Sequence, residues 1–285
     1  MQVGASGSDY VIPASLAEAA EMLTGGPRTI LAGGTDFYPA LVEKPPTLPV
    51  LDLSDISDLR GITAAADHYR VGAMTSWTDL VSADLPLSWR GLQSAASQVG
   101  SVQVQNLGTI GGNLCNASPA ADGVPPLLSL DASVELVSVR GSRTMRLDQF
   151  LIGYRATALA EDELLVAVLV PRPPEGSVSS FLKLGSRSYL AISIVMVAAL
   201  FAFENGRVSA ARIAVGACSP VARRLPDLET ALVGRSIDDD LVAMVAAHHL
   251  ADLSPIDDVR GSGSYRSDAA LTLVRRAVAD CVRQS

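Results

Sequence analysis

Residues 109–122 have the sequence TIGGNLCNASPAAD, which sets a glycine pair among polar side chains. Thr109 supplies a hydroxyl, Asn113 a carboxamide and Asp122 a carboxylate. Because glycine has no Cβ, its backbone N–H can approach a ligand closely, and the polar groups suit a ligand with phosphates and hydroxyls. The alternative is a polar loop in which Asn113 and Asp122 satisfy only their own turns.

A second glycine pair occurs in Ala32-Gly33-Gly34-Thr35-Asp36. It follows the apolar stretch 29–32, which predicts a buried strand, and it precedes a predicted helix. Such a turn can wrap a phosphate, although it matches neither the dinucleotide fingerprint nor a Walker loop and also suits an ordinary tight turn. Two such loops in one chain favour a nucleotide-like cofactor. Valine at Gly33 or Gly112 is therefore expected to block the ligand while the chain stays folded.

The sequence around these motifs predicts two segments that hold the glycine pairs. Ser15 and Glu18 form a capping-box pattern for a helix over 16–23, and prolines between Lys44 and Pro49 mark the end of the first segment. The second segment is predicted to contain a hairpin at 61–72, helices from Thr78 and Gly91, a glycine-rich loop at 108–113, and strands at 134–139, 144–147 and 164–170. The run Pro171-Arg172-Pro173-Pro174 predicts a linker.

A third segment follows this linker. Its strongest signal is the turn Asn205-Gly206 between the apolar stretches 190–203 and 208–216, a pattern typical of a β-hairpin. A strand at 181–184 and helices at 225–232, 239–250 and 269–282 complete the prediction.

Composition excludes several function classes. The chain has 285 residues, of which 48% are hydrophobic and 18% charged, so it has the composition of a folded globular protein. Its net charge of −8 argues against a nucleic-acid partner. The three cysteines are far apart, so they predict no metal site. The longest apolar stretch, 190–203, is shorter than the about 20 residues that span a bilayer, and the expected location is cytoplasmic.

Together, the two glycine motifs resemble those of the FAD-binding medium subunit of the molybdenum hydroxylases, the family of xanthine dehydrogenase and bacterial carbon monoxide dehydrogenase. The resemblance covers nearly the whole chain. It includes PASLAEA at 13–19, Glu163-Leu164-Leu165 and Phe181-Leu182-Lys183.

The resemblance implies an α+β fold in two parts. A two-lobed FAD-binding domain of the PCMH type is expected over residues 1–174, with lobes at about 1–55 and 56–174. A C-terminal flavoprotein domain with a three-stranded antiparallel sheet and a helix bundle is expected over 175–285.

The resemblance also implies a set of cofactor-binding residues. Ile30, Leu31, Ala32, Gly33, Gly34, Thr35 and Asp36 would cradle the FAD pyrophosphate, while Thr109, Gly112, Asn113 and Asp122 would hold phosphate and sugar hydroxyls. Leu165 would pack on the flavin, and Lys183 would lie near its polar edge, where a cation offsets the charge of reduced flavin. FAD is expected to be non-covalent, and no catalytic or metal-binding residue is expected. Gln105 stands where the family commonly has a basic residue, and the cysteines lack the grouping that binds an extra cluster in one branch.

The implied function is electron transfer within an oxidoreductase complex. An iron-sulfur small subunit would carry 2Fe-2S clusters and a large subunit the molybdopterin, in a dimer of heterotrimers, with FAD passing electrons to an external acceptor. A stand-alone FAD oxidase with its own substrate and a non-redox nucleotide-binding module are the alternatives. Tyr189 suits either a position at the flavin face or a core position at the start of a strand.

Overall fold

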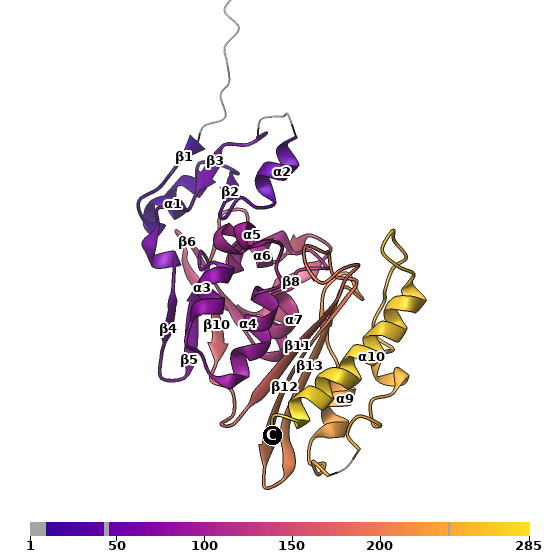
Figure 1. Ribbon diagram of the computed structural model, residues 1–285. Helices are drawn as coiled ribbons and strands as arrows, with labels where there is room; N and C mark the ends of the chain where they lie inside the picture. Colours follow the sequence, from indigo (N-terminus) through magenta and orange to yellow (C-terminus); the bar gives the residue numbers. More distant parts are fainter. Residues whose placement is uncertain (1–9, 43–45, 239) are drawn as a thin grey trace, which may run out of the picture.

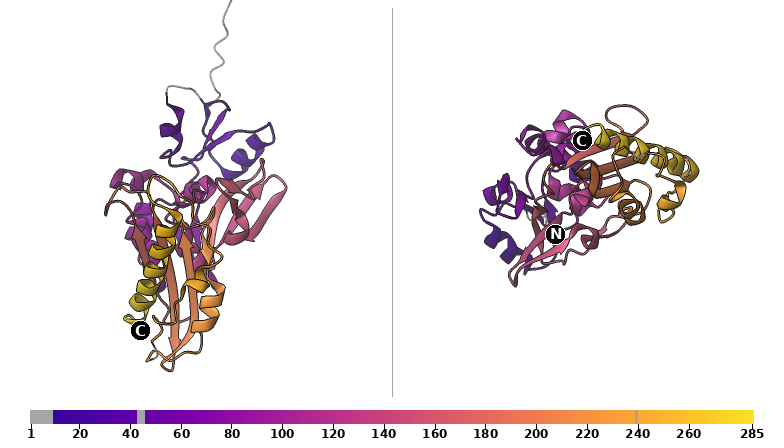
Figure 2. Two further views of the ribbon diagram at one scale, coloured as in Figure 1. Left: turned by 90° about the vertical axis from the view of Figure 1, so that its right-hand side faces the viewer. Right: turned by 90° about the horizontal axis from the view of Figure 1, so that it is seen from below.

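The computed structural model describes residues 10–42, 46–238 and 240–285 (Figure 1). Lys44 and Pro45, the start of the predicted boundary after the first segment, lie outside the described residues. The elements form three units that follow one another along the chain, and each unit is built on a sheet of its own (Figures 1 and 2).

The first unit is a small parallel sheet with two helices. Its strand order is β1-β3-β2, and both strand pairs are parallel. Ser15 caps the first helix by accepting from the N–H of Glu18, as the sequence predicts, whereas the Glu18 carboxylate accepts from the N–H of Ala14. The elements are β1 (Tyr10–Val11), α1 (Leu16–Leu23), β2 (Thr29–Leu31), α2 (Phe37–Leu41) and β3 (Val50–Asp52).

The second unit is a five-stranded antiparallel sheet covered by short helices. The strand order is β4-β5-β10-β6-β7, and the hairpin predicted at 61–72 is the pair β4–β5. The strands are β4 (Ile62–Ala64), β5 (His68–Gly72), β6 (Ser133–Ser138), β7 (Gly141–Arg146) and β10 (Leu164–Pro171), with a separate pair β8 (Leu151–Gly153) and β9 (Ala156–Thr157). The helices are η1 (Ser57–Leu59), α3 (Trp77–Ser82), η2 (Leu87–Trp89), α4 (Arg90–Ala96), α5 (Val102–Leu107), α6 (Ile110–Asn116), α7 (Val124–Ser129) and α8 (Leu147–Phe150).

The third unit is an antiparallel sheet with both faces covered. Val195, Val197, Ala199 and Phe201 pack in the cluster that contains the last helix, while the alternate residues of the same strand pack toward the second unit. This double burial explains why the strand is apolar without alternation. The elements are β11 (Val178–Leu184), β12 (Val195–Glu204), β13 (Arg207–Gly216), β14 (Arg223–Arg224), α9 (Pro226–Leu232), η3 (Ala247–Leu250) and α10 (Gly263–Val282).

The third unit differs from the sequence-based prediction in three places. The two-residue strand β14 extends the expected three strands to four. The predicted helix at 239–250 is wrong, because Ala246 is extended and Arg275 of α10 donates to the carbonyl of Val245. The last helix starts at Gly263 rather than Ala269, and its extra turns contain the buried Arg266, a residue that interrupts the apolar pattern. Figure 1 shows α10 lying along the sheet.

Candidate functional site

A cavity of ≈ 410 Å³ lies where three segments that are distant in the sequence meet. One wall comes from residues 30–37, at the end of β2 and beyond it. A second wall comes from residues 108–116, before and along α6, and a third from residues 159–165 at the start of β10. This volume is within the range of roughly 300–1,000 Å³ that is typical of ligand and cofactor sites. Eleven of the thirteen predicted site residues line it, namely Ile30, Leu31, Ala32, Gly33, Gly34, Thr35, Asp36, Thr109, Gly112, Asn113 and Leu165.

The glycine pair after β2 is required by backbone packing. A Cβ on Gly33 would lie 1.9 Å from the carbonyl oxygen of Leu107 at the end of α5. Gly34 has φ +70°, a conformation that side chains rarely adopt. The expectation that valine at Gly33 would leave the fold intact is therefore wrong, because any side chain there collides with the backbone.

The second glycine pair belongs to the first turn of a helix rather than to the loop that the sequence predicts. Thr109 caps α6, because its Oγ1 accepts from the N–H of Gly112 at 3.0 Å. Gly111 packs on the backbone of Ala73, where a Cβ would come within 2.7 Å of the Ala73 Cβ. Gly112 faces the cavity: beyond Thr109 Oγ1, the nearest neighbour of a Cβ there is the Cβ of Ala32 at 3.8 Å.

The cap predicts a measurable contribution to stability. Thr109 is buried, so Thr109→Ala is expected to lower the free energy of unfolding by about 1 kcal/mol, while Thr109→Ser keeps the oxygen and most of the stability. Urea denaturation of the cofactor-free chain measures both variants. Equal losses for alanine and serine would show that the methyl group, not the cap, matters.

Asn113, a residue of the cavity wall, carries an unsatisfied polar atom. Its Oδ1 is buried and has no hydrogen-bond partner within the described residues. This oxygen lies beside Gly123, behind the wall, and a ligand in the open cavity does not reach it. Asn113 nevertheless lines the cavity, and a side-chain amide can donate to phosphate or carbonyl oxygens. Together with the open space beside Gly112, this polar wall fits FAD.

Asp122 and Lys183, the other two predicted site residues, form a buried ion pair behind the cavity wall. Lys183 Nζ lies 2.6 Å from Asp122 Oδ2, and the two side chains are only 7% and 9% exposed. Ser193 donates to Asp122 Oδ1, and Lys183 also donates to the carbonyl of Gln98. Since Gln98 precedes Val99 of the wall, the pair lies next to the cavity without lining it. Burial raises the pKa of the Asp122 carboxyl, and the Lys183 ammonium opposes that rise.

The two carboxylates of the cavity wall are each paired with an arginine. Asp36 is paired with Arg155 at 3.1 Å, and Glu163 accepts from Arg143, which lowers the pKa of its carboxyl. Cys115 faces the cavity, and no lysine, arginine or histidine among the lining residues stands there to lower the pKa of its thiol. Within the described part of the chain, no three His, Cys, Asp or Glu side chains gather as a metal site.

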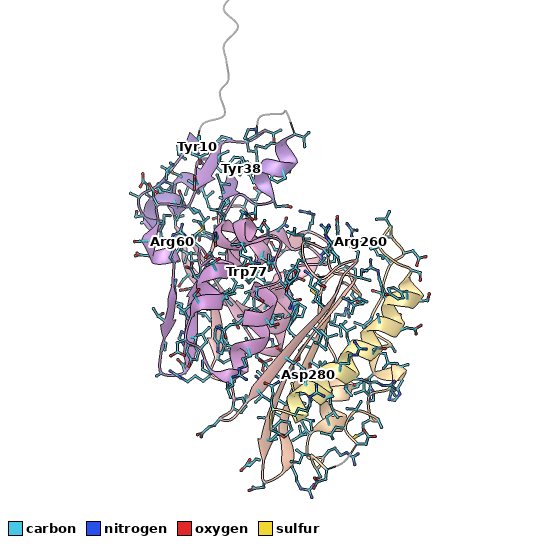
Figure 3. All side chains as sticks on the ribbon, viewed as in Figure 1. Tyr10, Tyr38, Arg60, Trp77, Arg260 and Asp280 are labelled. Atoms are coloured by element: carbon cyan, nitrogen blue, oxygen red, sulfur yellow. The ribbon has the colours of Figure 1, made fainter. Side chains whose placement is uncertain are left out.

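Sequence reasoning missed the apolar part of the wall. Met74, Trp77, Val99 and Val104 line the cavity, but their apolar spacing is equally typical of a core. Figure 3 labels Trp77 below the first unit, near the middle of the molecule. Tyr189 lies in the turn before β12 and is 72% exposed, so the interpretation as a core aromatic is wrong.

Comparison with known proteins assigns the fold and site to a class. Residues 4–173 match the family described as FAD binding domain in molybdopterin dehydrogenase, and residues 180–281 match the CO dehydrogenase flavoprotein C-terminal domain. The chain is thus an FAD-binding flavoprotein. It belongs to the family of FAD-binding medium subunits of the molybdenum hydroxylases, which are oxidoreductases, and this confirms the resemblance seen in the sequence.

Relatives and solved structures match almost end to end. The xanthine dehydrogenase FAD-binding subunit of Escherichia coli O157:H7 is 30% identical over 96% of both chains, and the carbon monoxide dehydrogenase medium chain of Hydrogenophaga pseudoflava is 31% identical over 95% of both. Carbon monoxide dehydrogenase from Oligotropha carboxidovorans superposes with a TM-score of 0.90 at 28% identity over 100% of both chains. Quinoline 2-oxidoreductase from Pseudomonas putida 86 gives 0.88 at 29% identity over 99% of both.

Among the helices of residues 10–42, 46–238 and 240–285, none combines the length and the apolar character that a bilayer-spanning helix needs.

Proposed function

We propose that this chain is the FAD-containing electron-transfer subunit of a molybdenum hydroxylase complex. Electrons would arrive from 2Fe-2S clusters on a small subunit, after substrate oxidation at the molybdopterin of a large subunit, and leave to an external acceptor. The complex would be a cytoplasmic dimer of heterotrimers. The chain would divide into an FAD-binding domain over 1–174 and a C-terminal domain over 175–285.

The cavity wall would hold FAD through residues of three elements. The backbone at 32–36 and Gly112 leave room for phosphates, Asn113 contributes an amide side chain, and Leu165 offers an apolar surface. When bound, FAD accepts electrons and passes them on. Asp122 and Lys183 would fix the loop behind the wall, because their ion pair joins residues from two of the three units.

The pairing of the wall carboxylates with arginines favours electron transfer over a stand-alone oxidase. A general acid or base needs a pKa near the working pH and a free bond for the substrate proton. Within the described wall, Asp36 and Glu163 are held by arginines, and no cationic side chain lines the cavity to activate the Cys115 thiol. Substrate oxidation in this cavity would therefore lack a free proton acceptor. This supports the proposal that the substrate reacts on a partner chain.

This proposal predicts that the isolated FAD-loaded chain does not react with organic substrates. Anaerobic mixing with xanthine, nicotine, caffeine or quinoline is expected to leave the flavin absorbance unchanged, because the molybdenum site would be on another chain. The assembled complex is expected to lose its flavin absorbance on addition of its own substrate. Bleaching of the isolated chain by any of these compounds would favour the stand-alone oxidase.

A further inference from the structure

A second cavity, of ≈ 520 Å³, lies on the other side of the loop that carries Asp122. It is lined by Ser118–Ala120 of that loop, Tyr154 and Arg155 after β8, Ile192 and Ser193 before β12, and part of the segment 254–260 before α10. We call it the arginine groove. It joins the second and third units, and no residue of its wall belongs to the flavin cavity.

The arginine groove carries a positive surplus in an acidic chain. Its charged lining residues are Arg155, Arg260, Arg266 and Asp258. Asp258 contacts both Arg260 and Arg266, and Arg155 is paired with Asp36, so two carboxylates face three guanidinium groups. Arg266 is buried and its terminal nitrogens already donate within the chain, so Arg155 and Arg260 are the groove arginines that an outside group can reach. Against a net charge of −8 for the whole chain, this surplus suits a carboxylate from outside.

A hydrogen-bonded turn beside the groove presents an exposed apolar side chain. Val259 is 97% exposed, at the tip of a turn in which Asp258 and Gly261 exchange backbone hydrogen bonds. Arg266, which is buried, holds the turn from beneath through Asp258 at 2.7 Å. Figure 3 shows the neighbouring Arg260 at the end of the third unit, far from Asp280 near the other end of α10.

Three more exposed apolar side chains surround the same groove: Tyr154, Ile192 and Ile256. Apolar side chains gathered at one hollow of a surface are typical of an interface, where aromatic residues and arginines contribute most of the binding energy. A fixed turn also loses little conformational entropy on binding. The groove is therefore preorganised for a protein partner.

Arg155 connects the groove to the flavin cavity. Arg155 lines the groove, and its guanidinium contacts Asp36 at 3.1 Å and the side chain of Asn116, both of which line the flavin cavity. Its backbone has φ +48° and is held by a hydrogen bond to the carbonyl of Ala117. A partner in the groove would thus be seated one side chain away from the flavin cavity.

We propose that the arginine groove is a docking surface for a partner subunit of the complex, which inserts a carboxylate-bearing segment between the arginines and packs apolar side chains on Val259. This inference rests on the proposed function, because it assigns a surface to the assembly that electron transfer requires. A small free polycarboxylate is the alternative occupant, and the test separates the two.

The test measures how strongly the variants Val259→Asp and Arg260→Glu assemble with the partner chains. The full chain is co-expressed with the partner chains with which it co-purifies, and its affinity for them is measured at low and high salt. Val259→Asp and Arg260→Glu are each expected to weaken assembly about tenfold or more, since the variants place negative charge opposite the inserted carboxylate. Flavin content is expected to stay unchanged, because neither residue lines the flavin cavity. The matched control is Val139→Asp, at an exposed valine of the turn between β6 and β7, which is expected to assemble normally.

Separate results overturn the two proposals. If the unaltered chain binds FAD but assembles with no partner chain, the proposed function fails. If the unaltered chain assembles and both groove variants assemble equally well, the docking surface is wrong. Citrate binding to the isolated chain that Arg260→Glu abolishes, together with unchanged assembly, would assign the groove to a small free anion and would also overturn the docking proposal.

Discussion

Replacement of Gly112 by valine is expected to remove FAD from the purified chain. A Cβ at this position has only Thr109 Oγ1 and the Ala32 Cβ as close protein neighbours, so the branched side chain would extend into the cavity. There it would occupy space that the cofactor needs, and the expected loss in FAD affinity is at least about tenfold, or about 1.4 kcal/mol. Flavin released by acid precipitation, measured per mole of protein, is the readout.

The fold is expected to survive this substitution. Gly112 lies in α6, where valine has a slightly better helix propensity than glycine, although Thr109 Oγ1 must move a few tenths of an ångström. Gly25→Val is the matched control, because Gly25 is exposed, lies outside the cavity wall, and would bring its Cβ only into ordinary contact with the Met22 carbonyl oxygen at 3.6 Å. Normal flavin content in Gly112→Val would contradict the site assignment, and a yellow pellet after acid treatment would contradict non-covalent binding.

The two glycine motifs illustrate what sequence patterns can and cannot predict. Their residue types predict a shared cofactor site, and both motifs line one cavity. The role of each glycine could not be predicted, because Gly33 and Gly111 are needed for contacts with Leu107 and Ala73, which come from other elements. Interpretation of residues 108–113 as a loop was wrong for the same reason: packing on Ala73 favours a helical turn that glycine propensity alone disfavours.

Local pattern was sufficient where neighbouring residues determine the structure. The Asn205-Gly206 turn and its apolar flanks gave the β12–β13 hairpin, in which Glu204 pairs with Arg207. Local pattern failed at 239–250. There the Val245 carbonyl, which a helix would have used, accepts from Arg275, 30 residues further along the chain. Long-range polar contacts of this kind have no signature in a single sequence.

The ion pair of Asp122 and Lys183 is buried, and loss of one partner of such a pair has a large energetic cost. Asp122 lies in the loop after α6 and Lys183 in β11, 61 residues apart, so the sequence suggested a shared ligand but not a direct bond. Lys183 is not a solvated lysine at a strand end, because its side chain is only 7% exposed. Removal of either charge leaves the other buried without its partner.

Lys183→Met is therefore expected to destabilise the chain by about 3–5 kcal/mol, which is the usual cost of breaking a buried ion pair from one side. The variant keeps the aliphatic length of the side chain, so lost packing contributes little. Thermal and urea unfolding of the FAD-free chain measure this loss without any contribution from the cofactor. Asp122→Asn/Lys183→Met, which also removes the stranded charge and keeps an acceptor for Ser193, is expected to recover part of the stability.

The loss should also depend on pH in a defined direction. Without the ammonium, only the hydrogen bond from Ser193 opposes desolvation of Asp122, so the pKa of its carboxyl in the folded chain rises further above the unfolded value of about 3.9. A group whose pKa is raised by folding stabilises the folded state when protonated, and this contribution disappears as the pH rises through the folded pKa. Lys183→Met should consequently be less destabilised near ~pH 5 than near ~pH 8, relative to the unaltered chain at each pH. The double variant, which has no carboxyl at position 122, should not show this difference. If Lys183→Met unfolds like the unaltered chain at both pH values, the pair does not stabilise the fold, and Lys183 is then better explained by the role at the polar edge of the flavin that the resemblance implies.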